Sequence, residues 1–408
     1  MRFQHVAGMQ DIMPNDSRAF KNIVELFSSY VESFGYELLV SPLLEDKELY
    51  VRSAGQQSDV VNKEMYELVD KSGNILVLRP EGTASVARAF IEHNPNLPFK
   101  VWYLTPAFRY ERPQKGRLRQ HHQLGIEYFG TRDFLADVEV IFILNNLFDK
   151  LAIKDRLLKI NTMGEPDCRE GYLNYLRSYL RNLETKLCSD HRLRYEKNPL
   201  RVLDCKKAEC KAATQNVNQL IDYVCQSCRD HFNKTCSELT SLGISYEVDF
   251  RLVRGFDYYT KTTFEFISPS LGPTQNALGG GGRYDNLVSS LGGKNMPAVG
   301  GAVGVERLML ANNKLTDNID IYLIASRLTT ALPILDQLSV LKKRIKFDLS
   351  HSSIVAGLKK ANKLKASFAL IIGKSEIESN SVTVKNMKTS EQQTVKTEML
   401  VEYLKGVL

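Results

Sequence analysis

A strongly basic segment, RYERPQKGRLRQ (residues 109–120), is the most unusual local feature of the sequence. It places five cations within eleven positions, with Glu111 as the one acid among them. Such a segment is too charged for a core element and predicts an exposed hairpin loop. If flanking strands hold Arg109 rigidly, its planar guanidinium can bind a phosphate through two parallel hydrogen bonds. An ordinary solvated loop is the alternative.

A second candidate site lies in LVRGFDYYTKTTFEF (residues 252–266). Arg254 precedes the paired rings of Tyr258 and Tyr259 there. Adjacent rings are common in protein cores, but a buried arginine beside them requires a polar partner. The glycine run GGGGRYD (residues 279–285) would let the backbone approach a ligand closely, although glycine runs also form plain turns. The sequence has no G-x-x-x-x-G-K-[ST] motif, so a nucleotide would not bind through a P-loop.

A metal site is a third possibility that the residue types raise. All seven cysteines lie between residues 168 and 236. Three spacings resemble zinc knuckles, namely Cys188-x-x-His191, Cys205-x4-Cys210 and Cys225-x-x-Cys228. Six ligands overfill one tetrahedral site and underfill two. Thiols in such a region are also commonly plain small side chains. On this count we expect no structural zinc and assign no metal ligand.

The overall composition is that of a globular protein. The chain has 408 residues, of which 43% are hydrophobic and 25% charged, and this balance excludes a disordered or fibrous protein. Its apolar runs are too short to span a bilayer, and its first residues lack the apolar core of a signal peptide. An odd number of cysteines does not suit a disulfide framework. We therefore expect a cytoplasmic protein without a membrane contact.

Positive charge is concentrated near the C-terminus. The formal net charge of the chain is +7, and residues 342–365 alone carry +7, with eight basic residues against Asp348. The eight are Lys342, Lys343, Arg344, Lys346, Lys359, Lys360, Lys363 and Lys365. Together with the basic loop at 109–120, they form two separate patches, which suits a polyanion contacted at two places. A solvated helix face is the alternative for the C-terminal patch.

The elements that would position these residues follow from hydrophobic periodicity. We expect helices at 18–34, 134–151 and 299–312, and strands at 36–42, 75–79, 101–105, 245–253 and 263–267, with further strands flanking the basic loop. After a linker at 312–318, alternating strands and helices predict a small α/β domain. The predicted organisation is a domain in two parts, 1–160 and 244–315, a helical insertion at 161–243 and the α/β domain at 316–408.

These motifs, in this order, resemble those of histidyl-tRNA synthetases of the bacterial type, which are class II aminoacyl-tRNA synthetases. The resemblance covers essentially the whole chain. GYELLVSP resembles the first class motif and ends at Pro42, FRYERPQKGRLRQ resembles the second with Arg109, and GAVGVERLML resembles the third with Arg307. The histidine-specific signatures are matched by LVRGFDYYTKTTFEF and GGGGRYD. RPEGTA (residues 79–84) resembles the amino-acid-binding segment.

The resemblance implies an α+β catalytic domain with an antiparallel sheet flanked by helices, a helical insertion and a C-terminal α/β anticodon-binding domain. It implies a histidine–tRNA ligase, which activates L-histidine with ATP to histidyl-adenylate and transfers the histidyl group to the 3′ end of tRNA(His). The products would be histidyl-tRNA, AMP and pyrophosphate. Implied partners are tRNA(His), L-histidine, ATP with Mg²⁺ on its phosphates, and a second copy of the chain in a homodimer that uses the first motif.

The resemblance also implies roles for individual residues. Arg109 would bind the α-phosphate, Arg307 the triphosphate tail, and Arg254 the charge shared by the carboxylate and the α-phosphate. Histidine would be bound by Glu81, Thr83, Gln123, Glu127, Tyr258, Tyr259 and Tyr284. Within that set, Glu127 and Tyr259 would contact the imidazole. The candidates for tRNA binding are Lys342, Lys343, Arg344, Lys359, Lys360 and Lys363.

Three residues depart from the family pattern. Gly301 and His121 stand where phenylalanine is expected, and Lys261 stands where glycine is common, so local packing there is in doubt. The closest alternative is a non-catalytic paralogue that regulates ATP phosphoribosyltransferase, but that family typically lacks the C-terminal domain and loses motif arginines that this chain retains. An RNA-binding module without catalysis would explain the basic patches but not the acidic and tyrosine residues of the implied histidine site.

Overall fold

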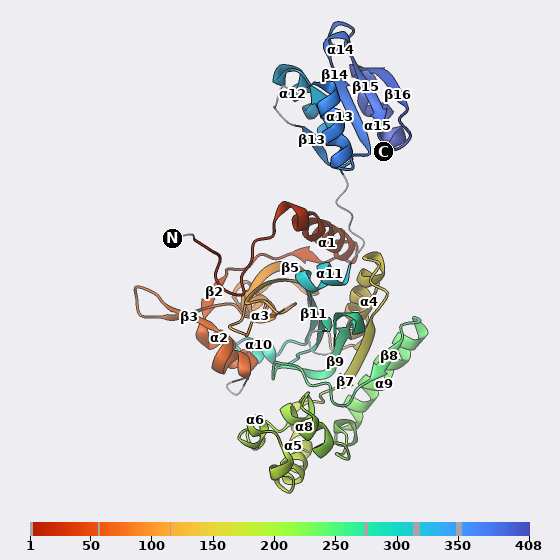
Figure 1. Ribbon diagram of the computed structural model, residues 1–408. Helices are drawn as coiled ribbons and strands as arrows, with labels where there is room; N and C mark the ends of the chain where they lie inside the picture. Colours follow the sequence, from red (N-terminus) through yellow and green to blue (C-terminus); the bar gives the residue numbers. More distant parts are fainter. Residues whose placement is uncertain (1–2, 56–57, 115, 273–275, 313–318, 348–352) are drawn as a thin grey trace. The chain divides into compact units, whose positions relative to one another are not determined.

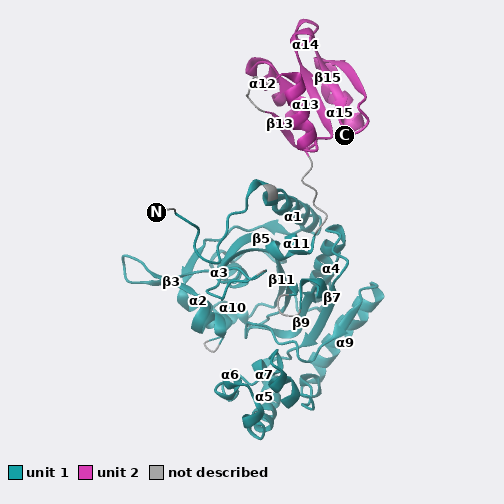
Figure 2. Cartoon of the chain, viewed as in Figure 1, with its two compact units in different colours: residues 1–314 teal, residues 315–408 magenta. Residues whose placement is uncertain are grey.

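The computed structural model describes residues 3–55, 58–114, 116–272, 276–312, 319–347 and 353–408 (Figure 1). The chain divides into two compact units, Met1–Lys314 and Leu315–Leu408 (Figure 2). Apart from Asn312, the expected linker at 312–318 lies outside the described residues, as does Asp348 of the C-terminal basic patch. Each unit has hydrophobic cores of its own.

An eight-stranded sheet forms the centre of the first unit, in the order β1-β5-β6-β11-β10-β9-β7-β8. Its inner strands pair antiparallel, and the edge strands β1 and β8 pair parallel with their neighbours. The strands are β1 (Glu37–Leu38), β5 (Phe99–Phe108), β6 (Gln120–Phe129), β7 (Leu157–Thr162), β8 (Tyr246–Val248), β9 (Thr260–Ile267), β10 (Ala277–Arg283) and β11 (Ala298–Gly304). This antiparallel sheet with flanking helices confirms the predicted fold class.

Helices pack on both faces of this sheet. Alternate residues of β5 belong to different cores, Trp102 to one and Val101 and Tyr103 to the other, because successive side chains of a strand point to opposite faces. Helices on the Trp102 side are α1 (Pro14–Glu32), α4 (Phe134–Lys150), α9 (Gln226–Ser241) and α11 (Val305–Ala311). On the other side lie α3 (Thr83–His93), α10 (Leu287–Ser290) and α5 (Pro166–Arg181). Asp133 caps α4, since its carboxylate accepts a hydrogen bond from Leu135 N at 2.9 Å.

Two glycine-rich strands, β10 and β11, pair in the middle of the sheet. They approach so closely that a Cβ on Gly279 would lie 2.5 Å from the Ala302 carbonyl oxygen. The helix expected at 299–312 is therefore wrong in its first part, which is β11, and right in its second, which is α11. The buried Val299 and Val303 face the core from the strand rather than from a helix.

A small sheet and a helical region complete the first unit. The small sheet has the order β2-β4-β3, from β2 (Leu44–Asp46), β3 (Tyr66–Val69) and β4 (Ile75–Leu78), with α2 (Lys47–Ala54) beside it. The helical region contains α5, α6 (Ser189–Arg192), α7 (Leu200–Leu203), α8 (Ala208–Ala213) and α9. The strand expected at 245–253 is shorter in the structure, because Asp249 accepts from Arg251 N at 3.0 Å and turns the chain after β8.

The second unit is an α/β domain, as predicted. Its five-stranded sheet has the order β13-β12-β14-β15-β16. The strands are β12 (Ile321–Ala325), β13 (Ile345–Phe347), β14 (Phe368–Ile372), β15 (Ser381–Asn386) and β16 (Gln392–Lys396), and the helices are α12 (Leu328–Leu338), α13 (Ile354–Lys363), α14 (Lys374–Glu378) and α15 (Leu400–Val407). α12 and α15 share one core and α13 packs on another, so helices cover both faces. In the parts of the chain described here, no helix combines the length and apolar character needed to cross a membrane.

Candidate active site

A pocket of about 440 Å³ lies at the glycine-rich strands of the first unit. Nine of the ten residues expected to bind ATP or histidine line it: Arg109, Arg254, Arg307, Glu81, Thr83, Gln123, Tyr258, Tyr259 and Tyr284. The tenth, Glu127, is fully buried behind the pocket surface. Residues far apart in the sequence, from RPEGTA to the third motif, thus converge on one cavity.

Two of the arginines are fixed by backbone carbonyl groups. Arg109 Nε donates to Pro80 O at 3.0 Å. Arg307 Nε donates to Gly116 O at 3.0 Å, and its Nη1 donates to Ala277 O at 2.6 Å. Burial lowers the pKa of both guanidinium groups, but an arginine pKa is so high that both stay charged at neutral pH. The pocket therefore presents fixed positive charge.

Arg254 is held differently, by a carboxylate. Its Nη1 donates to Glu265 at 2.5 Å, while its buried Nε has no hydrogen-bond partner in the described part of the chain. Burial lowers and the Glu265 charge raises the pKa of Arg254, with an upward net shift. Gly280 leaves room for the guanidinium, since a Cβ there would lie 2.8 Å from Nη1. A buried donor without a partner in a pocket wall is available to a ligand oxygen.

The RPEGTA segment places a carboxylate at the start of α3. Glu81 accepts from Thr83 N at 2.6 Å and from Ala84 N at 2.9 Å, so it satisfies two of the free donors of that helix. Burial nevertheless raises the pKa of Glu81. Arg79 anchors the segment from behind, with Nη1 donating to Ser41 Oγ at 2.7 Å. The carboxylate is thus rigidly held in the pocket wall.

Glu127 supports the pocket from behind. It accepts hydrogen bonds from Thr83 Oγ1 at 2.6 Å, from Tyr103 OH at 3.2 Å and from Tyr284 OH. Burial raises the pKa of Glu127 to about 8, although the hydrogen bonds from Thr83 and Tyr284 lower it. Gly300 is required opposite this carboxyl group, because an added Cβ would overlap it. Thr83 and Tyr284 therefore owe their positions in the wall to a buried carboxyl group.

Aromatic rings form another part of the wall. The Tyr258 ring stacks on Phe256 with centroids 5.3 Å apart and meets the Tyr284 ring edge-on at 5.7 Å. Tyr259 lies beside it at 4.7 Å. In the same pocket, Gln123 Oε1 is buried without a hydrogen-bond partner in the described ranges. The rings give the site a defined shape, and the amide oxygen gives it an unused acceptor.

Several lining residues were missed by the sequence reasoning, among them Tyr103, His121, Glu306, Arg201, Asp204 and Lys206. His121 was noted only as a departure from the family pattern. Burial, and then the charges of Arg109 and Arg307, lower the pKa of His121 to about 3, so its ring is neutral at pH 7. Its position next to the basic loop was a signal for this placement. The last three lining residues come from the helical region and had no local signal.

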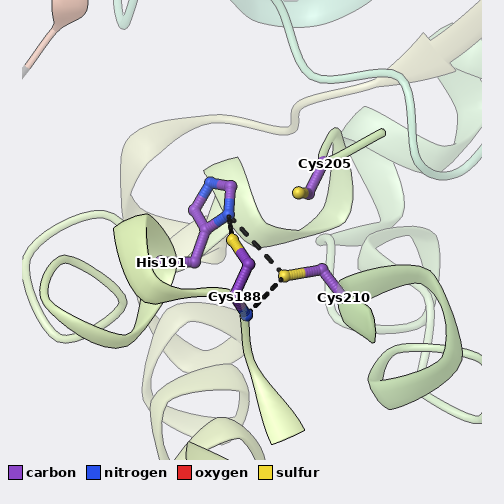
Figure 3. Close-up of side chains that lie close together, drawn as sticks. All are labelled: Cys188, His191, Cys205 and Cys210. Carbon is purple, nitrogen blue, oxygen red and sulfur yellow. Dashed lines mark hydrogen bonds between the residues drawn. The ribbon is translucent and has the colours of Figure 1, made fainter. Parts of the chain in front are cut away.

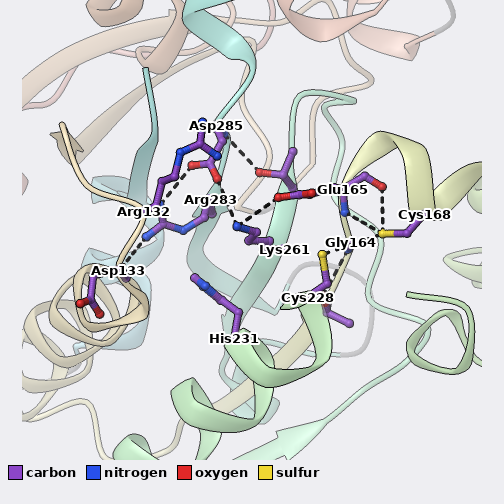
Figure 4. Close-up of polar contacts among 12 residues, drawn as sticks. Arg132, Asp133, Gly164, Glu165, Cys168, Cys228, His231, Lys261, Arg283 and Asp285 are labelled. Atoms are coloured by element: carbon purple, nitrogen blue, oxygen red, sulfur yellow. Dashed lines mark hydrogen bonds and ion pairs between the residues drawn. The ribbon is translucent and has the colours of Figure 1, made fainter. Parts of the chain in front are cut away.

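Lys261 belongs to an ion-pair network around the buried Arg283 (Figure 4). Arg283 Nε donates to Asp137 at 2.9 Å and its Nη1 to Asp285 at 3.1 Å, and Lys261 pairs with Glu165 at 3.2 Å and Asp285 at 3.8 Å. Lys261 has φ of 45°, in the left-handed region that favours glycine. Glycine would adopt this backbone conformation without strain, and the two ion pairs explain how a lysine is accommodated.

The candidate tRNA-binding residues lie in the second unit. Lys342, Lys343 and Arg344 precede β13, and Lys359, Lys360 and Lys363 lie on α13. Four of the six side chains are exposed and two, Arg344 and Lys360, are partly buried. Lys343 Nζ donates to the carbonyl oxygen of Leu408 at 3.3 Å.

Comparisons with known proteins agree with this geometry. Residues 8–164 and 183–308 match a family model described as "Histidyl-tRNA synthetase", and residues 325–406 match one described as "Anticodon binding domain". The antiparallel sheet and its motif arginines place the first unit among the class II aminoacyl-tRNA synthetases.

Individual relatives show to which family of class II synthetases the chain is similar. The histidine–tRNA ligase of Caldanaerobacter subterraneus subsp. tengcongensis is 40% identical over 98% of both chains, and that of Nitratiruptor sp. is 42% identical over 98% of this chain and 100% of its own. The crystal structure of the apo histidyl-tRNA synthetase of S. aureus has a TM-score of 0.77 and 30% identity, covering 99% of this chain and 100% of that one. The chain belongs to the histidyl-tRNA synthetase family.

Proposed function

We propose that the protein is a histidine–tRNA ligase. It activates L-histidine with ATP to histidyl-adenylate, releasing pyrophosphate, and transfers the histidyl group to the 3′ end of tRNA(His), releasing AMP. The observation that supports this most strongly is that three arginines held by hydrogen bonds, the carboxyl group of Glu81 at the start of α3 and a cluster of tyrosines all line one pocket. We expect the reaction to take place in the cytoplasm.

Activation requires two anions to meet. A carboxylate oxygen of histidine attacks the α-phosphorus of ATP in line, so that a new oxygen–phosphorus bond forms, and the bond from the α-phosphorus to the bridging oxygen breaks as pyrophosphate leaves. Fixed positive charge stabilises this transition state without reorganisation during the reaction. We assign the α-phosphate to Arg109, the triphosphate tail to Arg307, and the charge shared by both reactants to Arg254. The Mg²⁺ that accompanies ATP would find carboxylates of the type it accepts in Glu265 and Glu306 of the pocket wall.

Selection of histidine requires polar groups that match its ammonium and imidazole. We assign the α-ammonium to Glu81, Thr83 and Gln123, and the imidazole to Glu127 and Tyr259, with Tyr258 and Tyr284 completing the pocket. The unpartnered Gln123 Oε1 supports its assignment to an ammonium donor. Because Glu127 lies behind the pocket surface, its contact with the imidazole requires Thr83 or Tyr284 to release it. Such a site disfavours an apolar isostere by about 10⁴-fold or more, because its polar groups would stay unpaired.

The second unit would bind tRNA through its basic residues. We assign phosphate contacts to the six candidates on α13 and before β13, where most of the side chains are exposed. We also infer a homodimer that uses the first motif. Its segment exposes apolar side chains that water disfavours, with Leu38 55% and Val40 82% exposed.

The alternative, a non-catalytic paralogue that regulates ATP phosphoribosyltransferase, is not favoured. A Bacillus halodurans protein described as an ATP phosphoribosyltransferase regulatory subunit/histidyl-tRNA synthetase is 23% identical with a TM-score of 0.65, and at this identity it supports the fold alone. The pocket wall carries all three arginines and six of the seven residues assigned to histidine, Glu127 lies buried behind that wall, and residues 325–406 match the anticodon-binding domain model.

ATP–pyrophosphate exchange, measured with each of the twenty amino acids separately, tests the proposal. We expect exchange with histidine alone. A folded protein that gives no exchange with any amino acid would contradict the proposal and favour the regulatory paralogue.

The role of Arg254 has its own test. Arg254→Ala should slow single-turnover adenylate formation by orders of magnitude with little change in histidine binding, because the positive charge acts on the transition state. Arg181→Ala, at an exposed surface pair, is the control. A near-normal rate in Arg254→Ala would remove Arg254 from the mechanism.

A further inference from the structure

The cysteines of the helical region form two groups in the described residues. The first, the Cys3His group, consists of Cys188, His191, Cys205 and Cys210. The second, the three-thiol group, consists of Cys168, Cys225 and Cys228. In the sequence, the six ligands of three spacings were counted together and Cys168 was not among them, so structural zinc was not expected. The fold instead separates the ligands into a set of four and a set of three, and a set of four fits one tetrahedral site.

The Cys3His group has the spacing of a tetrahedral metal site (Figure 3). His191 Nδ1 lies 3.2 Å from Cys188 Sγ and 3.7 Å from Cys210 Sγ, and all four ligand atoms lie within 4.8 Å of one another. With zinc bonds of about 2.3 Å to sulfur and about 2.0 Å to nitrogen, tetrahedral ligand atoms stand about 3.8 Å apart for two sulfurs and about 3.5 Å apart for sulfur and nitrogen. Small side-chain movements would complete the geometry.

The helices that carry these ligands are too short to be stable by themselves. α6 and α7 have four residues each and α8 has six, whereas isolated helices below about 12 residues are marginal in water. Cys188 precedes α6, Cys205 lies between α7 and α8, and Cys210 lies within α8. One ion bound to all three would join the short helices, which is how structural zinc contributes to folding.

The three cysteines of this group have little exposure to solvent. Cys188, Cys205 and Cys210 are 5%, 8% and 0% exposed. Cys188 N donates to Cys210 Sγ at 3.4 Å, and such outer hydrogen bonds orient metal ligands. Cysteines that only fill space in a core do not need an imidazole nitrogen close to them, whereas here His191 Nδ1 lies close to two of the sulfur atoms. The burial of the cysteines and the orientation of His191 therefore favour a role as metal ligands over a role in core packing alone.

We propose that the Cys3His group binds one Zn²⁺ ion and that this ion fixes one wall of the active-site pocket. Cys205 lies between Asp204 and Lys206, and both of these residues line the pocket together with Arg201. Arg201 Nη2 also donates to Gly255 O at 2.5 Å, in the segment that carries the catalytic arginine. Metal binding stands independently of the proposed function, while its effect on catalysis rests on that function.

The ligand chemistry selects the metal. Three thiolates and a neutral imidazole suit Zn²⁺, whereas Mg²⁺ and Ca²⁺ prefer oxygen ligands. Binding releases the three thiol protons and changes no oxidation state. Four protein ligands leave no open position, so the ion is structural.

The three-thiol group provides an internal comparison. Cys168 Sγ lies 3.8 Å from Cys228 Sγ, and both appear in Figure 4. Cys225 is exposed, and no fourth ligand joins this group in the described part of the chain. We make no proposal for it.

Zinc stoichiometry of the full chain is the primary test. The protein is stripped with a chelator, re-equilibrated with Zn²⁺, and its bound zinc is measured by inductively coupled plasma mass spectrometry. We expect Cys205→Ser to bind one zinc ion fewer than the wild type. Cys236→Ser, at a cysteine outside both groups, should bind as much as the wild type. Equal zinc in Cys205→Ser and the wild type, or loss only in Cys225→Ser, would overturn the proposal.

A spectroscopic test keeps the proposal falsifiable if Cys205→Ser does not fold. Co²⁺ added to the stripped Cys225→Ser protein, whose Cys3His group is intact, should give intense tetrahedral d–d bands and thiolate-to-cobalt charge transfer. Added Zn²⁺ should remove both signals. A cobalt spectrum without sulfur charge transfer would overturn the site.

The pocket wall has a separate readout. Zinc should protect residues 183–215 from limited proteolysis, and reloading the stripped protein should restore histidine-dependent exchange. Unchanged proteolysis with and without bound zinc would overturn the role in the wall. Because proteolysis does not depend on histidine activation, a failure of the proposed function would be recognised separately, by absent exchange in a zinc-protected protein.

Discussion

Gly300 lies where β11 passes the buried carboxyl group of Glu127, and alanine at this position tests how tightly the pocket is built. The added Cβ would overlap the carboxyl group and lie 2.6 Å from the Ile126 carbonyl oxygen. Glu127 is fully buried and bonded to Thr83 and Tyr284, so it has no open space to enter. The substitution must therefore separate β11 from β6 or break hydrogen bonds of Glu127.

The magnitude follows from two costs. Overpacking a close-packed interior costs about 1–3 kcal/mol. Each buried polar group that loses its partner adds about 1–3 kcal/mol. With one or two such groups, Gly300→Ala should lower the free energy of unfolding by roughly 2–9 kcal/mol, which is a large share of the roughly 5–15 kcal/mol of a typical domain. The KM for histidine should rise as well, because Thr83 and Tyr284 move with Glu127.

Urea denaturation followed by circular dichroism, and exchange kinetics with varied histidine, measure the two effects. Gly171→Ala is the matched control, since Gly171 is exposed within α5 and an added Cβ meets nothing within 4 Å. Alanine there should stabilise the helix by about 0.5–1 kcal/mol. A Gly300→Ala protein with the urea midpoint and histidine KM of the wild type would refute the enclosed position of Glu127.

Three further outcomes are expected. Because burial raises the pKa of Glu127 from 4.5 to about 8, the folded protein keeps a proton there that the unfolded chain loses, so the free energy of unfolding falls as pH rises between these values. Glu127→Gln should flatten this slope, of at most about 1.4 kcal/mol per pH unit, in urea titrations at several pH values; an identical slope would contradict the raised pKa. Arg283→Ala should cost about 3–5 kcal/mol in the same assay because buried carboxylates lose their cation, whereas the exposed Arg181→Ala should leave the stability nearly unchanged. Lys359→Gln should reduce the slope of log tRNA affinity against log salt by about 0.7–0.9 relative to Lys388→Gln on the exposed β15–β16 turn, and equal slopes would argue against a phosphate contact.

The parts of the pocket that lie in contiguous motifs could be predicted from the sequence. The strands expected at both flanks of the basic loop are β5, which ends directly before Arg109, and β6, which contains Gln123, and both residues line the pocket. RPEGTA was identified only through the family resemblance, and the helix α3 that begins at its Thr83 was not expected. In each case the residue and the element that holds it are neighbours in the sequence.

The rest depended on contacts between distant segments. β11 was expected as helix because glycine has no side chain that could show the alternating pattern of a strand. The need for glycine becomes visible only in the structure, where the close pairing with β10 leaves no room for a larger residue. The positive φ of Lys261 could not be predicted, because the residue type lysine does not indicate a left-handed backbone conformation. Asp204 and Lys206 reach the pocket through the packing of the helical region, which neither periodicity nor charge indicates.

The distribution of charge around the pocket explains how one cavity can orient both substrates of the proposed reaction. Arg109 interacts electrostatically with two other arginines, Arg254 and Arg307, and also with Glu81. It therefore lies where the cationic and the acidic parts of the wall meet. Histidine is a zwitterion, and in the proposed binding mode its ammonium would be attracted to Glu81 and its carboxylate to the arginines. An amino acid held in this way directs its carboxylate toward the phosphates that the same arginines bind, which is the orientation that in-line attack requires. Because Glu81 and Arg109 are fixed by backbone groups, the orientation is set before either substrate arrives.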